Sequence, residues 1–99
     1  MVEFSVKSTL SNEIDQEEVR DVLSKALARE AKLAESKRAY FEGRCQHFEQ
    51  TYEMTSDVFM QRFESGELGD DAAYFDWYAA KRGHDLWVRR ARILSGVQI

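Results

Sequence analysis

The sequence predicts an all-α fold in which a long helix, a short capped helix and a third long helix form an antiparallel bundle, preceded by a short N-terminal strand or arm. Residues 15–52 contain no proline and a single glycine, which favours one long helix. Apolar residues recur at three- and four-residue steps, and polar caps or glycines stand at the expected helix ends. A chain of 99 residues is expected to be one domain, residues 1–99.

The first ten residues have the pattern of a strand-like arm. Val2, Phe4 and Val6 alternate with polar residues, as in a half-buried strand. No second strand accompanies it. We therefore expect its backbone to pair with another copy or with the sheet edge of a partner, or to remain a solvated arm. These three residues are candidate partner-binding residues.

The first helix is expected at residues 15–52, which would span about 55 Å if unbroken. Such a helix either breaks near Gly43 or projects its N-terminal half beyond a compact domain. Projection would leave Val19, Leu23 and Leu27, together with Ala26, exposed unless a second chain covers them. This argument predicts a homo-oligomer when the protein is free and adds Val19, Leu23 and Leu27 to the candidate partner-binding residues.

The second helix is expected at residues 56–65. Thr55 or Ser56 can cap its N-terminus, Asp57 suits its first turn, and Gly66 can take the left-handed conformation that ends a helix. The residues expected to be buried are Val58, Phe59 and Phe63.

The third helix is expected at residues 71–95, after a turn through Gly69, with Asp70 as the N-cap. Its apolar residues follow the four- and three-residue steps of a seam between packed helices. Trp77 and Trp87 are expected to be the central residues of this seam, which is formed by Ala73, Trp77, Ala80, His84, Trp87, Ala91 and Leu94.

Charge and composition limit the partners. A formal net charge of -4 argues against nucleic acid, whose affinity for proteins comes from neutralised phosphates. No apolar stretch approaches the ~20 residues needed to cross a bilayer, so no membrane is expected. The single cysteine excludes an intrachain disulfide and favours a cytoplasmic protein.

Acidic residues are concentrated between residues 57 and 76, where Arg62 is the only base. Helix-dipole complementarity is one interpretation, because acids are favoured near helix N-termini. The alternative is an acidic surface that steers a basic protein partner. The candidate binding residues for that partner are Glu64, Glu67, Asp70 and Asp71.

No catalytic residues, metal or cofactor are predicted, and the chain is not expected to be an enzyme. Cys45 and His47 are two residues apart, so on a helix they point in nearly opposite directions and cannot chelate one ion. His84 lies on the apolar seam, where a hydrogen-bonded histidine is the commoner role.

Residues 54–82, MTSDVFMQRFESGELGDDAAYFDWYAAKR, resemble small helical proteins of bacteria and archaea that are encoded beside RelE-like or TumE-type toxins. The resemblance rests on the Met54-Thr55 cap, the two phenylalanines of the short helix, the GELGDD turn and the following aromatic-Trp helix. It implies the antitoxin of a toxin–antitoxin pair, which neutralises a basic, ribonuclease-like toxin. The alternative is a homo-oligomeric helical adaptor or structural bundle.

Overall fold

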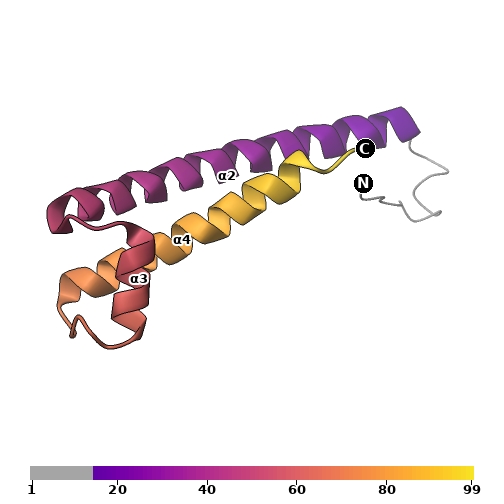
Figure 1. Ribbon diagram of the computed structural model, residues 1–99. Coiled ribbons are helices and arrows are strands. Elements are labelled where there is room, and N and C mark those ends of the chain that lie inside the picture. Colours follow the sequence, from indigo (N-terminus) through magenta and orange to yellow (C-terminus); the bar gives the residue numbers. More distant parts are fainter. Residues whose placement is uncertain (1–14) are drawn as a thin grey trace.

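The computed structural model describes residues 15–99, and these residues form three α-helices (Figure 1). They are α2 (Gln16–Tyr52), α3 (Ser56–Glu64) and α4 (Ala72–Ser95). Helices α2 and α4 run side by side in opposite directions, and the short α3 lies against them at one end. The predicted all-α antiparallel bundle is confirmed. The expected strand-like arm, residues 1–10 with Val2, Phe4 and Val6, lies outside the described residues.

Helix α2 passes through Gly43 without a break. Its N-cap is Asp15, whose Oδ1 accepts a hydrogen bond from the backbone N–H of Glu17 at 3.0 Å. It ends where Glu53 takes the left-handed conformation, with φ of 55°. Because the helix is continuous, the molecule is a rod with extents of 61 × 22 × 22 Å. One glycine costs a helix only about 1 kcal/mol, which packing against α4 easily offsets. None of the three helices is apolar enough over a sufficient length to cross a membrane.

The N-terminal half of α2 is better covered than expected. Val19, Leu23 and Leu27 are half-buried in the single chain. The expectation that this stripe is exposed is therefore wrong, because α4 and the residues after it run back beside this half of α2 (Figure 1). The large apolar residues that α2 does expose are Val22, Leu33 and Tyr40.

The core is built around Trp77 of α4, which has no solvent exposure. Its ring stacks on Phe59 of α3, with centroids 4.0 Å apart and an interplanar angle of 7°. Two rings of α2 also stack on it, Phe48 at 5.7 Å and Tyr52 at 5.6 Å. The indole Nε1 donates a hydrogen bond to Ser56 Oγ at 2.9 Å. One side chain thus joins all three helices.

Two details of the short helix and its turn differ from expectation. Val58 is 37% exposed, because the α3 face next to the core is filled by Phe59 and Phe63. The N-cap of α4 is Asp71, whose Oδ1 accepts from Ala73 N at 3.0 Å, so the assignment of Asp70 as the cap is wrong by one residue. A cap carboxylate must reach the N–H two or three residues ahead, and Asp71 does so.

The expectation that both tryptophans form the centre of the seam holds for Trp77 only. Trp87 is half-buried, and the Arg90 guanidinium lies 4.8 Å from the centre of its ring. The physical reason is position, because the cluster that includes α3 lies near the start of α4, around Trp77, whereas Trp87 lies ten residues further along α4.

We expect Trp77→Ala to lower the free energy of unfolding by about 3–5 kcal/mol, since a fully buried aromatic ring is removed from the junction of three helices. Trp87→Ala should cost clearly less, because part of that ring already faces solvent. Urea unfolding followed by circular dichroism measures both losses. Equal losses for the two variants would contradict this assignment of the core.

Two glycines provide a matched test of the helix packing. A Cβ at Gly43 would have no neighbour within 4 Å, whereas a Cβ at Gly83 would lie 2.8 Å from the ring of Phe41. Gly43→Ala should therefore raise the free energy of unfolding by about 0.5–1 kcal/mol through helix propensity. Gly83→Ala should lower it by about 1 kcal/mol, because the ring must move. Chemical denaturation distinguishes the two, and a stabilising Gly83→Ala would show that the α2–α4 contact is looser here.

Candidate functional site

The predicted acidic residues lie on a folded turn at the α3 end of the rod. Thr55 Oγ1 caps α3 by accepting from Val58 N at 3.2 Å, and the chain leaves the helix through Gly66, whose φ is 82°. The backbone N–H of Glu67 then donates to the Arg62 carbonyl at 3.0 Å. Leu68, within the turn, packs against the core and so anchors the turn. The acids that follow are thus carried on an ordered segment.

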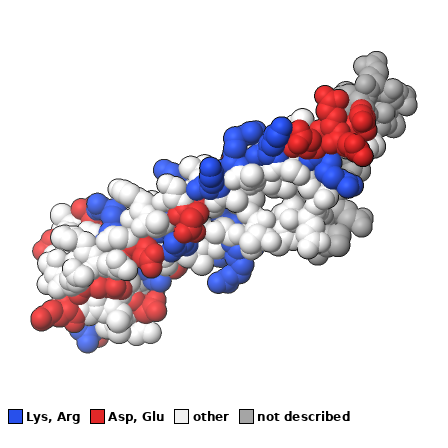
Figure 2. Space-filling view, turned by 90° about the horizontal axis from the view of Figure 1, so that it is seen from above, with Lys and Arg blue, Asp and Glu red and all other residues white. Residues whose placement is uncertain are grey.

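All four predicted acidic residues, Glu64, Glu67, Asp70 and Asp71, are exposed. Asp71 also caps α4, and Glu67 lies 3.8 Å from Arg62. Within the described residues, Glu64 and Asp70 have no basic side chain at ion-pair distance. We call this end of the molecule, residues 55–76, the acidic head. Figure 2 shows acidic side chains over both ends of the rod and basic ones over its middle.

Within residues 15–99, the predicted binding residues do not form one continuous surface. The acidic head lies at one end of the rod, whereas Val19, Leu23 and Leu27 lie in the half of α2 near the other end (Figure 1). One small molecule could therefore not cover both groups of residues without extending along the rod.

An exposed aromatic ring stands within the acidic head. Phe75 is 54% exposed, and its ring meets the edge of Phe63 at 5.3 Å and 89°. Phe63 in turn stacks on Phe59 at 5.4 Å. Exposed aromatic rings are enriched at protein interfaces, so Phe75 is a candidate anchor. Phe75 is not among the binding residues predicted from the sequence, although its position two residues before Trp77 places it off the buried seam.

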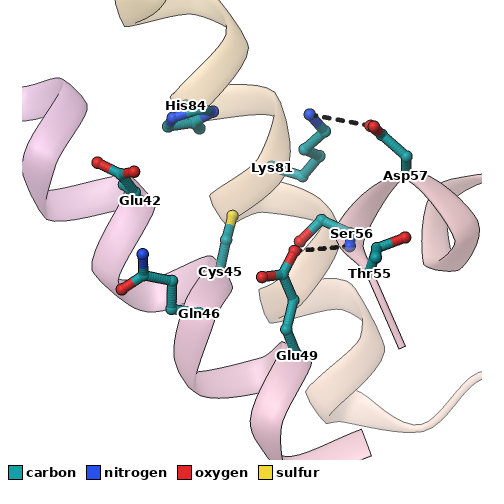
Figure 3. A pocket seen from close by; sticks show the side chains of 9 residues that line it. All are labelled: Glu42, Cys45, Gln46, Glu49, Thr55, Ser56, Asp57, Lys81 and His84. Atoms are coloured by element: carbon teal, nitrogen blue, oxygen red, sulfur yellow. Dashed lines mark hydrogen bonds and ion pairs between the residues drawn. The ribbon is translucent and has the colours of Figure 1, made fainter. Parts of the chain in front are cut away.

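A polar cleft of about 190 Å³ lies where α2, the start of α3 and α4 meet (Figure 3). Lys81 Nζ bridges Asp57 Oδ1 at 3.2 Å and Asp85 Oδ1 at 2.9 Å. On the α2 side, Glu49 Oε2 accepts a hydrogen bond from Ser56 N at 2.8 Å. The cleft residues are Glu42, Cys45, Gln46, Glu49, Thr55, Ser56, Asp57, Lys81 and His84. These contacts tie the N-terminus of α3 to both long helices.

The thiol and the amine of the cleft are held in their unreactive forms. Burial raises the pKa of the Cys45 thiol, and the nearby Ser56 hydroxyl only partly opposes that effect. Burial alone would lower the pKa of Lys81, but hydrogen bonds to Asp85 and Asp57 outweigh it and raise the pKa. At neutral pH the lysine is therefore a cation and the cysteine a neutral thiol, so neither is poised to attack a substrate.

The remaining polar groups of the cleft give no further catalytic arrangement. His84 Nδ1 lies 3.8 Å from Asp85 Oδ1, beyond hydrogen-bond distance. Among residues 15–99, no three acidic, histidine or cysteine side chains are grouped so that they could hold a metal ion. The contacts that the structure gives the cleft are those that join the start of α3 to α2 and α4.

The sequence held no local signal for this cleft. Its residues come from three helices, and Glu49 and Lys81 bond to α3 groups that only the tertiary fold brings near. Cys45 is buried and His47 is exposed.

No protein-family model, curated protein or solved structure matches this chain.

Cys45 is the only cysteine in the chain, so its reactivity reports directly on the cleft. We expect a thiol-specific reagent at pH 8 to modify the native protein far more slowly than the protein unfolded in urea. Burial blocks access, and the raised pKa keeps the thiolate fraction below that of a free thiol, whose pKa is about 8.5. Because the Cys45 pKa is higher in the folded protein, the unfolded protein loses the thiol proton first as the pH rises. The free energy of unfolding should therefore fall as the pH rises above the pKa of the unfolded thiol. A native rate close to the unfolded rate would show that the cleft opens readily.

Proposed function

We propose that this protein is a non-enzymatic binding protein that holds a basic protein partner on the acidic head, as the antitoxin of a toxin–antitoxin pair does. The observation that carries the proposal is the concentration of exposed carboxylates at one end of the rod, in the segment that also exposes Phe75. The resemblance of residues 54–82 to antitoxins of ribonuclease-like toxins supports the same function.

Charge and apolar contact affect different steps of binding in this proposal. Exposed acids such as Glu64 and Asp70 attract a basic surface over several ångströms and mainly raise the association rate. An apolar ring such as Phe75, once covered, slows dissociation. A ribonuclease-like toxin suits this surface because its RNA-binding residues are basic, and covering them would block the substrate.

A homo-oligomeric adaptor is the second candidate function. It is favoured by the exposed apolar residues Val22, Leu33 and Tyr40 on α2, which lie away from the acidic head. The two functions predict different partners, since an adaptor needs no toxic neighbour.

The test is co-expression with the product of the adjacent gene, followed by pull-down and a growth-rescue assay. The double variant Glu64→Lys with Asp70→Lys should slow association and weaken its salt dependence, because these two acids take part in no cap and no described ion pair. Phe75→Ala should instead speed dissociation. Deletion of residues 1–7 tests whether the arm, with Val2, Phe4 and Val6, contributes as well, and faster dissociation is expected.

A matched control reverses two exposed acids in the N-terminal half of α2 that take part in no described ion pair, Glu17→Lys with Glu30→Lys, and should leave binding nearly unchanged. The antitoxin function is excluded if the neighbouring product is not toxic or does not co-purify. The acidic head is excluded as the binding surface if the control double variant slows association as much as the Glu64→Lys with Asp70→Lys double variant does.

A further inference from the structure

The two flanks of the α2–α4 pair differ in chemistry. Glu42 of α2 lines the polar cleft. Leu33 lies nine residues before Glu42 and Tyr40 two residues before it, and at 100° per residue both separations are about half a turn. Leu33 and Tyr40 therefore stand on the side of α2 that faces away from the cleft.

Helix α4 repeats this arrangement. Asp85 lies on the cleft side, where it bonds Lys81. Trp87 and Leu94 follow Asp85 by two and nine residues, so they too stand about half a turn away from it. The pair of helices thus has a charged flank and an apolar flank. We define the apolar flank by Val22, Leu33 and Tyr40 of α2 with Trp87 and Leu94 of α4.

Much of the apolar flank is open to solvent. Val22 is 59% exposed and Tyr40 57% exposed, while Trp87 and Leu94 are half-buried. Val22, Leu33 and Tyr40 are separated by eleven and seven residues, which are whole numbers of helical turns, so they form one stripe. Single exposed apolar residues are ordinary, but an aligned set on two helices is typical of an interface.

Charge along the same stripe indicates what covers it. Glu18 lies four residues before Val22, and Arg44 lies four residues after Tyr40, and both are exposed. The stripe therefore begins with an acid and ends with a base. Reversing its direction exchanges the two, so an antiparallel second copy places Val22 against Tyr40 and Glu18 against Arg44 in one register. A parallel copy would place like charges together.

We propose that the apolar flank is the interface of a two-fold dimer, in which the α2 helices of two copies pack antiparallel and Glu18 of each copy meets Arg44 of the other. The two-fold axis crosses the interface at the level of residue 31, midway between Val22 and Tyr40, on the side of α2 that carries Leu33. Trp87 and Leu94 border the stripe, so the two helical pairs form a four-helix arrangement. This dimer does not depend on the proposed function, since the acidic head lies outside the interface.

The interface is of modest size. Arg29 and Ser36 interrupt the apolar stripe, and the axis places Arg29 of one copy against Leu33 of the other. An arginine can cover leucine with its aliphatic stem while its charged group reaches solvent. We therefore expect a dissociation constant on the order of micromolar, not nanomolar.

The first test is the mass of the full chain in solution. Sedimentation should give twice the chain mass of 11.5 kDa at high micromolar concentration. Val22→Ser with Tyr40→Ser should convert it to a monomer with unchanged helicity, because both side chains are exposed in the single chain. A wild-type monomer at these concentrations, or a dimer that this variant leaves intact, would overturn the proposal.

A charge-swap cycle tests the register. Glu18→Arg alone and Arg44→Glu alone should each weaken the dimer about tenfold, since two attractive pairs become two repulsive ones. The double variant Glu18→Arg with Arg44→Glu should recover most of the affinity. The matched control is Glu17→Arg, which alters the same helical turn off the stripe and should change the dissociation constant little. Additive losses in the double variant, or an equal loss for Glu17→Arg, would exclude this antiparallel register.

Discussion

Trp77 contacts each of the three helices described in residues 15–99, and the rest of this structure depends on these contacts. Its ring stacks on Phe59 of α3 and on Phe48 of α2, and its Nε1 donates to Ser56 at the first residue of α3. The short helix has only nine residues and would not be stable alone. Stacking and the buried hydrogen bond therefore supply the orientation that α3 could not maintain by itself.

The position of the acidic head follows from this anchor. Because Phe59 and Phe63 of α3 are held by the core, the turn after α3 cannot swing away, and its carboxylates keep a defined spacing. The polar cleft on the other side of α3 has the complementary role. There Lys81 and Glu49 bond to the start of α3, so both ends of the short helix are fixed. A rigid charged surface loses little entropy on binding, which suits protein recognition.

The sequence predicted the helices to within about one residue, because their ends are set by local chemistry such as the Thr55 cap and Gly66. It also identified the exposed acids of the turn. It could not say whether α2 breaks at Gly43, because that depends on how α4 packs beside it. It wrongly placed Trp87 at the centre of the core and wrongly predicted that the stripe containing Val19 is exposed. Burial at both places depends on where α3 and α4 end. The sequence did not predict the cleft for the same reason, because its residues come from α2, the start of α3 and α4.

The unequal lengths of the two long helices imply a gradient of local stability along the rod. Helix α2 has 37 residues and α4 has 24, so the first turns of α2 have no helical neighbour in α4 to pack against. Their amide hydrogens should exchange with solvent through small opening motions, whereas amides around Phe48 should exchange only when the whole core opens. The chain would then behave as two cooperative units, with the aromatic end opening last.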